Sequence, residues 1–402
     1  MELADGYDLR VAVEADVEQV ADLLAERGDA ADAVDLRLVV EDPSEGLEAC
    51  FVVTHGDRIV STATVLREAV RIGGVEIPTG QVELVATASD HEGRGLVRAL
   101  IDEAHRRSSA RGDLLQVMIG IPYFYRQFGY SYAIPIPRVR QLRPNAPVRN
   151  PAITVRAATH DDIVAMRRLQ DEAQDDADVA MPHSPSCWRW LIDRDGSTQR
   201  VAESDSHVIA TCRVTPPGED LVVAELAGSV EGVQALIADA AGAAGSTTVQ
   251  ERPHTSVNAT IDDLVAPIEG PAALHEWYYA RIEYLAPLLE RLAPLLLARA
   301  ESAGLLDHSH DVLLSTFRSH VRFTIGPDGM SPVDTGGTEQ APTSKGGSGI
   351  PPDALPPLVL GPQGALGLEA SVPDVYLGRQ RELMSALFPP MHADLLTFYL
   401  PV

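Results

Sequence analysis

The chain opens with a hydrophobic pattern that changes from strand spacing to helix spacing. Residues 8–28 begin with a short alternating run and continue with apolar residues at helical intervals, namely Val17, Val20, Leu23 and Leu24. Asp16 stands directly before them, where a helix N-cap is expected. Farther on, residues 51–53 and 59–65 flank a turn at 55–57 and predict a β-hairpin.

The next pattern predicts a strand, a glycine-containing loop and a long helix. An apolar run over 82–88 leads into the loop HEGRG at 91–95, and helical spacing then runs from Leu96 to a stop at Gly112. Residues 113–120 predict another strand, and the aromatic segment YFYRQFGYSY follows at 123–132.

The opening pattern recurs in the middle of the chain. Residues 153–173 repeat a strand, an acidic cap and an amphipathic helix. A second copy of one architecture explains the repeat, and a chance match of two short strand–helix pairs is the alternative. The counterpart of the loop, within 221–244, has neither paired glycines nor an arginine before its helix. If it is a copy, it has lost that loop.

The C-terminal third has a different pattern. A short strand from Trp277 precedes a long amphipathic helix, in which residues 285–297 are the most apolar. Residues 321–326 and 364–370 are strand-like, and the Gly-, Pro-, Ser- and Thr-rich stretch 327–357 predicts a flexible loop. The chain stays apolar to its last residue, which predicts a docked terminus.

Composition narrows the possible partners and compartments. A length of 402 residues predicts several domains, and a net charge of −26 disfavours nucleic acid and anionic membranes. Three cysteines without CxxC spacing indicate neither a disulfide framework nor structural zinc, so we expect no metal and a reducing cytoplasm. The N-terminus is not a signal peptide, and no apolar run has the length of a membrane span.

The loop at 91–95 has two interpretations. A purely structural turn would more often use Asn, Asp or Pro with a single glycine. Alternatively, the backbone N–H groups at the start of the helix point at an anion such as a pyrophosphate, and glycine leaves room for its oxygens. The loop is neither a Walker loop nor a dinucleotide GxGxxG motif.

Together with the aromatic segment, this loop resembles the GNAT acetyltransferases. Their motif is a strand, a Q/R-x-x-G-x-G/A loop and a helix, followed after another strand by a segment of the type F-Y-x-x-F-G-Y/F. Tyr125, Phe128, Gly129 and Tyr130 stand at the matching places of the second part. This resemblance covers about residues 1–150 in detail.

Over its full length, the chain resembles the enhanced-intracellular-survival (Eis) type of acetyltransferase. The resemblance implies an α/β (α+β) fold with tandem GNAT-like domains, each with a mixed central sheet, and a sterol-carrier-protein-like α+β domain. The expected domains are a catalytic domain at 1–150, a degenerate GNAT-like domain at 151–282 and a sterol-carrier-protein-like domain at 283–402. It also implies a bacterial homo-oligomer such as a hexamer, which acetylates amines of aminoglycosides, polyamines or lysine side chains with acetyl-CoA.

The resemblance also assigns residues to roles. A backbone N–H near residues 85–87 would hold the thioester carbonyl, Tyr125 would protonate the leaving thiolate, and the Val402 carboxylate would serve the amine. The expected cofactor-binding residues are Val85, Ala86, Thr87, Gly93, Arg94, Gly95, Leu96, Val97, Arg98, Gly120 and Ile121.

Two positions depart from the family pattern. Glu92 stands where Arg or Gln is usual, so its carboxylate either points away from the pyrophosphate or weakens cofactor binding; Arg94 and Arg98 could compensate. Val97 replaces the last small residue of the loop, a change that Eis-type members tolerate.

Other candidate residues have simpler interpretations. We expect Tyr123 and Tyr130 to be ordinary half-buried aromatics, Trp188 and Trp190 to pack in a core, and the HSHD run at 308–311 to be a helix-terminal loop. The alternative function is a catalytically weak GNAT-like binding module, or an oligomeric scaffold, with an apolar ligand in the third domain.

Overall fold

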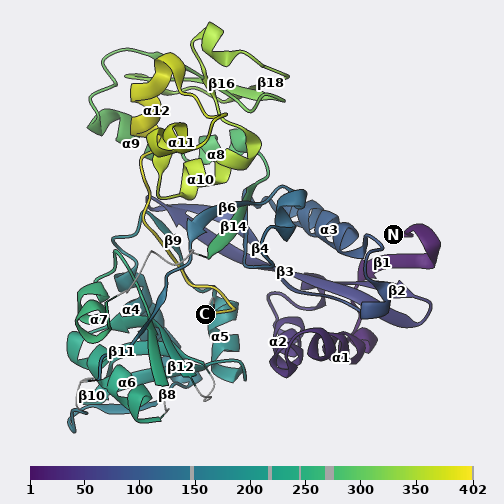
Figure 1. Ribbon diagram of the computed structural model, residues 1–402, viewed down its shortest axis with the longest axis vertical. Coiled ribbons are helices and arrows are strands. Elements are labelled where there is room, and N and C mark those ends of the chain that lie inside the picture. Colours follow the sequence, from purple (N-terminus) through teal and green to yellow (C-terminus); the bar gives the residue numbers. More distant parts are fainter. Residues whose placement is uncertain (145–148, 216–219, 244–245, 268–275, 401–402) are drawn as a thin grey trace.

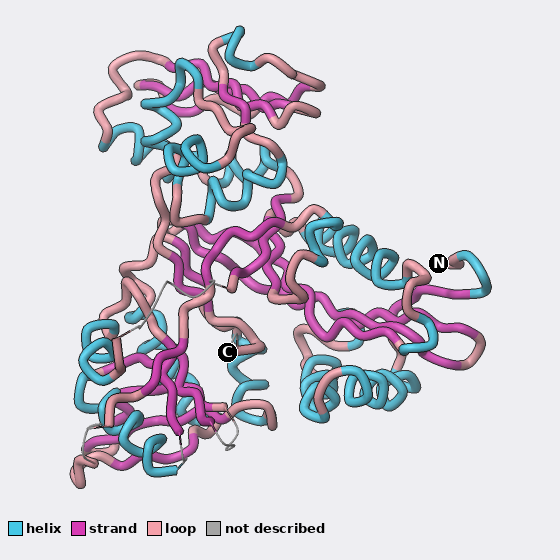
Figure 2. Tube along the Cα trace, in the orientation of Figure 1, coloured by secondary structure: helices cyan, strands magenta, loops and turns pink. Residues whose placement is uncertain are grey.

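Three β-sheets with their covering helices make up the computed structural model (Figure 1). It describes residues 1–144, 149–215, 220–243, 246–267 and 276–400. The strands of the first sheet extend from the N-terminal end to the centre of the molecule, where the other two assemblies meet it (Figure 2). No helix in these ranges combines the length and the apolar character needed to cross a bilayer.

The first sheet has the order β1-β2-β3-β4-β5-β14-β6, with β9 paired to β3 and β20 paired to β9. Its strands are β1 (Tyr7–Val11), β2 (Cys50–His55), β3 (Arg58–Ile72), β4 (Val75–Thr87), β5 (Leu115–Met118), β6 (Ser131–Pro135), β9 (Val179–Met181), β14 (Trp277–Ile282) and β20 (Ala393–Leu395). Helix α3 (Leu96–Arg111) covers one face, and α1 (Val17–Arg27) and α2 (Ala30–Glu41) cover the other (Figure 1). The predicted hairpin, loop and long helix of this region are therefore confirmed.

The second sheet has the order β7-β13-β12-β11-β10-β8. Its strands are β7 (Val139–Gln141), β8 (Thr154–Ala157), β10 (Thr198–Ser204), β11 (His207–Val214), β12 (Asp220–Gly228) and β13 (Ser246–Gln250), with helices α4 (Ile163–Ala173), α5 (Pro185–Asp193), α6 (Val230–Ala243) and α7 (Asn258–Leu264). Read from β8, these six strands correspond in order to the first six strands of the first sheet read from β1.

One pair of ionic contacts recurs at the start of both units. Arg10 donates two hydrogen bonds to Asp16 directly before α1, and Arg156 donates two to Asp162 directly before α4. The sequence repeat therefore corresponds to a repeated contact at the same place in the fold.

Each of these two sheets takes a strand from outside its own stretch of sequence. β14, within the range expected for the second domain, lies between β5 and β6 of the first sheet. β7, within the range expected for the first domain, pairs with β13 of the second. The strands of the two sheets therefore cross the boundaries suggested by the sequence.

The third sheet comprises β15 (His310–Ser315), β16 (His320–Gly326), β17 (Gly329–Met330), β18 (Asp334–Gly336) and β19 (Ser348–Gly349). Its helices are α8 (Leu285–Arg291), α9 (Ala293–Ser302), α10 (Leu355–Leu360), α11 (Gly364–Ser371) and α12 (Arg381–Leu387). One apolar core joins them to the edge of the first sheet, with Tyr278, Leu289 and Leu358 among its members.

Three expectations for this region are wrong. Residues 364–370 form α11 and not a strand, because Ala365 and Leu368 bury one helical face. The stretch 327–357 contains β17, β18 and β19, since its backbone pairs with β15 and β16. Residues 285–297 form two helices that meet at Leu292, with a proline in the first turn of α9.

Candidate active site

The fourth strand of the first sheet separates from its parallel neighbour at a bulge. β4 pairs with β5 only over residues 79–81, although β4 continues to Thr87. Leu84 has a φ of 52°, and the register with β3 slips between Thr62 and Thr64. The bulge turns the end of β4 away from β5, so residues 85–87 lack β5 as a partner.

The glycine loop lies at the end of this gap. Gly93 and Gly95 have φ values of 71° and 78°, a conformation that side chains disfavour. A Cβ at either position would meet no described atom within 4 Å, so the space beside the loop is open. Gly95 is the N-cap of α3 and has no side chain with which to satisfy the first amides of that helix. These amides and the helix dipole form a site suited to an anion.

The carboxylate of Glu92 is paired across the entrance of this site. Arg27, at the end of α1, forms an ion pair with Glu92, and both side chains are partly exposed. The pair neutralises the negative charge that the sequence places beside the anion site. Arg98 donates to Gln127 (2.8 Å) and its guanidinium lies 4.8 Å from the ring centroid of Phe128, whereas Arg94 donates to the Asp90 carbonyl.

A cavity of about 660 Å³ connects the gap, the loop and the aromatic segment. Tyr125 lies in the 3₁₀ turn η5 (Phe124–Phe128) and lines this cavity. Its side chain is buried, and its hydroxyl makes no hydrogen bond to any described residue. Burial, with a smaller contribution from the charge of Glu83, raises the pKa of Tyr125 to about 12, so the phenol keeps its proton at neutral pH.

A second, smaller cavity of about 180 Å³ lies beside the first one along β4. Glu83, Asp32 and Tyr399 line it, and Arg27, Val85 and Ala86 line both cavities. The two spaces therefore meet at the bulge of β4.

Glu83 is the most distinctive group of this second cavity. It is 8% exposed and accepts a hydrogen bond from Gln81. Burial raises the pKa of Glu83 to about 8, and the nearby charges of Asp32 and Asp35 act in the same direction. A cation entering this cavity would favour the ionised carboxylate.

The C-terminal segment reaches the same cavity. Tyr399 donates from its hydroxyl to Asp32 Oδ1 (3.0 Å). Figure 1 shows this segment passing from the third sheet to a position between the first two sheets. Val402, the expected carboxylate donor, lies outside the described residues, which end at Leu400.

Comparison with known proteins identifies the chemistry of this region. A family model described as acetyltransferase (GNAT) domain matches residues 8–133. The first unit is a GNAT acetyltransferase domain. The chain is therefore an enzyme of the acetyl-CoA-dependent N-acetyltransferase class. A search of curated protein sequences found no match.

Solved structures resemble the chain along almost all of its length. The GCN5-related N-acetyltransferase from Anabaena variabilis has a TM-score of 0.70 at 14% identity, with 97% of this chain and 99% of that one covered. The GCN5-related N-acetyltransferase from Kribbella flavida has a TM-score of 0.66 at 18% identity, with 99% and 100% covered. Eis1 from Mycobacterium abscessus has a TM-score of 0.61 at 15% identity, with 97% and 99% covered. Likeness at these identities shows a shared fold.

Most of the expected cofactor-binding residues of the GNAT domain lie around the larger cavity. Those that line it are Val85, Ala86, Thr87, Gly93, Gly95, Leu96, Val97, Arg98 and Ile121. Arg94 and Gly120 do not line it, and a Cβ at Gly120 would lie 2.2 Å from the Tyr125 ring. Gly120 thus makes room for Tyr125.

Sequence reasoning missed several residues of this GNAT domain. Arg27, His91 and Phe124 line the larger cavity, and Asp32 and Glu83 line the smaller one. The sequence does contain a signal for Glu83, because it is the acidic residue inside the apolar strand VELVATA. Burying a carboxylate costs free energy unless a partner compensates it, so such a residue indicates a function.

The exposure of the other aromatic side chains can be compared with what the sequence predicts. Trp188 and Trp190 are buried in a core, as expected. Tyr123 is 71% exposed, contrary to expectation, and Tyr130 is fully buried with its hydroxyl donating to Gln116.

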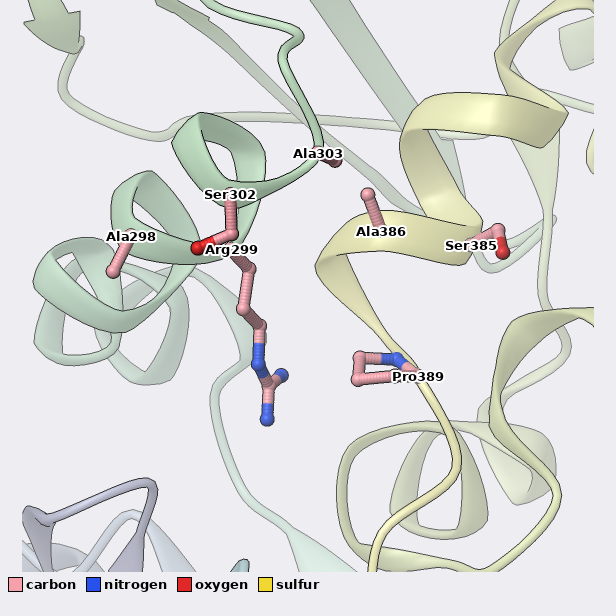
Figure 3. Close-up of a pocket in the computed structure, with 7 residues that line it drawn as sticks. All are labelled: Ala298, Arg299, Ser302, Ala303, Ser385, Ala386 and Pro389. Atoms are coloured by element: carbon pink, nitrogen blue, oxygen red, sulfur yellow. The ribbon is translucent and has the colours of Figure 1, made fainter.

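Two other places on the chain offer less to a ligand. A pocket of about 420 Å³ between α9 and α12 is lined by small side chains and the Arg299 guanidinium (Figure 3). Such a lining offers little apolar surface to a lipid-like ligand. Asp307, His308 and His310 have ligand-type atoms within 4.8 Å of one another, in and just after the turn between α9 and β15. His310 donates from Nε2 to the Leu305 carbonyl (2.7 Å), and Asp307 and His308 are exposed.

Proposed function

We propose that this chain is an Eis-type acetyltransferase that transfers the acetyl group of acetyl-CoA to a primary amine of a cationic substrate. Aminoglycosides, polyamines and lysine side chains are the candidate acceptors. One observation carries the proposal: an anion-suited cavity and an acid-lined cavity meet at Val85 and Ala86. A negatively charged acetyl donor and a positively charged acceptor could therefore approach the same strand from two sides.

The proposed domains keep the bounds expected from the sequence, although β9, β14 and β20 complete the sheet of the first domain and β7 that of the second. Residues 1–150 form the catalytic domain, 151–282 a degenerate GNAT-like domain, and 283–402 a sterol-carrier-protein-like domain. Loss of the second site is supported by α6, where the Ser229 hydroxyl accepts from the Gly232 amide (3.1 Å) and so occupies the first turn. The likeness in fold to Eis1 over nearly the whole length supports the Eis-type assignment. A cytoplasmic homo-oligomer is part of the same proposal.

The residues around the larger cavity fit the parts of acetyl-CoA. The amides after Gly95 and the guanidinium of Arg98 would hold the pyrophosphate, and the backbone of 85–87 would run beside the pantetheine arm. Bound there, acetyl-CoA supplies an activated acyl carbon and a thiolate leaving group.

The chain's own groups then have three tasks. A backbone N–H at the bulge would donate to the thioester carbonyl oxygen, where negative charge develops as the amine attacks. Tyr125 would give its proton to the departing sulfur, since its hydroxyl is protonated and makes no hydrogen bond to a described residue, and would regain a proton from the attacking nitrogen as the amide forms. Glu83, or the Val402 carboxylate, would hold the ammonium group and receive a proton from it, leaving the neutral amine that attacks.

An acceptor with several positive charges is supported by the surroundings of the smaller cavity. Asp32 and Glu83 line it, and Asp35 lies close by, fully buried against Arg194. The net charge of −26 would draw polycations toward the protein over long range.

Two measurements test the proposal. Thermal-shift titration should show stabilisation by acetyl-CoA, and a thiol-release assay over aminoglycosides, polyamines and lysine peptides should show turnover with at least one. Binding of acetyl-CoA without thiol release from any amine would reject the enzyme and favour the binding module. Amidating the C-terminus by semisynthesis removes the Val402 charge and keeps every side chain, so unchanged turnover would leave Glu83 as the amine's base.

A further inference from the structure

The second sheet keeps the bulge that opens the cofactor gap in the first. Glu225 has a φ of 52°, as Leu84 does, and the register of β11 with β12 slips between Thr211 and Arg213. β12 pairs with β13 only over residues 220–223 and then continues to Gly228 with β11 as its strand partner. In the first sheet, the equivalent separation opens on the larger cavity.

In the second sheet, buried polar side chains occupy this separation. Arg252 lies two residues after the end of β13 and donates to the Leu226 carbonyl (2.7 Å) and to Gln170 Oε1 (2.6 Å). Gln170, from α4, donates to the Glu225 carbonyl (2.6 Å). Arg252 is 3% exposed and Gln170 is 2% exposed. The backbone next to the second bulge is therefore bonded by side chains of the chain itself.

The same arginine binds the C-terminal segment. Arg252 Nε lies 3.0 Å from Asp394 Oδ1 and its second nitrogen lies 2.8 Å from Oδ2, and Gln174 also donates to Asp394. The segment then runs parallel to β9, with the Leu396 amide donating to the Met181 carbonyl. A bidentate pair of this kind fixes both position and direction.

Glu225, the residue at the second bulge, contacts an arginine that also binds the C-terminal segment. Glu225 pairs with Arg213 (3.2 Å) and with His183 (3.0 Å), and all three side chains are almost fully buried. Arg213 donates to the Thr397 carbonyl (2.8 Å) and to the Phe398 carbonyl, which also accepts from Arg194. Burial alone would raise the pKa of Glu225, but His183 and Arg213 hold it down at about 2, so the carboxylate stays charged.

Beyond Phe398 the segment enters the acceptor side of the active centre. Tyr399 lines the smaller cavity with Glu83 and Val85. The Arg194 guanidinium lies 4.5 Å from the ring centroid of Phe398 and 5.1 Å from that of Tyr399. Because the anchor at Asp394 lies only five residues before Tyr399, a shift at the anchor would move that ring.

We propose that the strand gap of the second sheet is a binding site for the chain's own C-terminal segment, with Arg252 and Arg213 as positioning residues for the amine-accepting side of the catalytic domain. The site takes an extended peptide with one carboxylate, Asp394, seated on Arg252. This inference rests on the proposed function, because it assigns Tyr399 a place beside the acceptor.

Asp394→Asn in the full chain tests the site. The matched control is Asp162→Asn, which removes an equally buried bidentate partner, that of Arg156, without touching the segment. We expect Asp394→Asn to reduce kcat/KM for the amine by about 10- to 100-fold while the Kd of acetyl-CoA stays unchanged. Hydrogen exchange at Leu396 should become faster in this variant and not in the control.

Equal effects of the two variants on both readouts would overturn the proposal, since Asp394 would then act only through stability. If Asp394→Asn does not fold, Arg213→Lys serves instead, because one ammonium nitrogen keeps the charge beside Glu225 but cannot reproduce the contacts that the guanidinium makes from three separate nitrogens. Hydrogen exchange also distinguishes a failure of this proposal from a failure of the proposed enzymatic function. A parent chain without turnover on any amine would refute the enzyme, whereas unchanged exchange at Leu396 would refute the site.

Discussion

Leu84 and Glu225 occupy the same backbone position in two different sheets. Each has a φ of 52° beside a register slip, on a strand that has just parted from its parallel neighbour. One is apolar and lines the smaller cavity, and the other is a carboxylate that contacts the buried side chains of Arg213 and His183. One bulge thus borders an open cavity, and the other is filled by the chain.

Gly95→Asp should abolish the stabilisation that acetyl-CoA gives. The new side chain would strain a backbone with φ of 78°, at a cost of about 1–2 kcal/mol, and would place a carboxylate at the anion site. Gly112→Asp is the matched control, because Gly112 ends the same helix with φ of 85° and open space around it. Thermal-shift titration should show the acetyl-CoA response in the control alone; a full response in both would make the loop structural.

Arg27→Gln should weaken acetyl-CoA binding by about two- to fivefold, because it leaves Glu92 unpaired beside the anion site. Adding Glu92→Gln to that variant should restore the parent's affinity. Isothermal titration at low and high salt measures both, and the difference should shrink as salt rises. Equal losses in the single and double variants would show that Arg27 contacts the cofactor itself.

Tyr125→Phe should reduce kcat by about 100-fold and leave the Kd of acetyl-CoA unchanged, because only the departing sulfur uses the hydroxyl. The melting temperature should not fall, since the hydroxyl makes no hydrogen bond to a described residue. Tyr123→Phe, which removes an exposed hydroxyl two residues away, is the control. Full turnover in Tyr125→Phe would assign the proton to another group.

Glu83→Gln should remove the inflection near pH 8 from the pH–rate profile of acetyl transfer. If the carboxylate serves the ammonium group, the rate rises as Glu83 ionises, through its pKa of about 8. Glu68→Gln is the control, because burial also raises the pKa of Glu68 to about 8 although it does not line the cavity. A pH–rate profile that keeps its inflection in Glu83→Gln and loses it in Glu68→Gln would contradict the assignment.

The raised pKa of Glu83 also predicts how the stability of the fold depends on pH. The pKa of Glu83 is about 8 in the folded protein and has its ordinary value of 4.5 in the unfolded chain. Its contribution to the free energy of unfolding is therefore fully present below pH 4.5 and is lost as the pH rises through about 8. The melting temperature of the parent should therefore fall between about pH 5 and pH 8. Glu83→Gln should flatten that fall, which differential scanning calorimetry would detect.

The sequence predicted those parts of the site that depend on local backbone chemistry. Gly95 and Tyr125 were found because positive φ and motif spacing leave a trace within a few residues. Arg27 and Asp32 were missed because tertiary packing alone brings α1 and α2 to β4. The strand expected at 364–370 was wrong for a related reason: a short apolar run fits either period, and only burial against other helices decides between them.

The exchange of β14 and β7 determines how the molecule can be divided. β14 fills the space between β5 and β6, yet more than a hundred residues separate it from either neighbour along the chain. A fragment that stops at residue 150 would keep the glycine loop and Tyr125 but would expose two bare sheet edges, which are prone to aggregation. The catalytic unit is therefore not a portable module, and its folding must wait until the ribosome has made most of the chain.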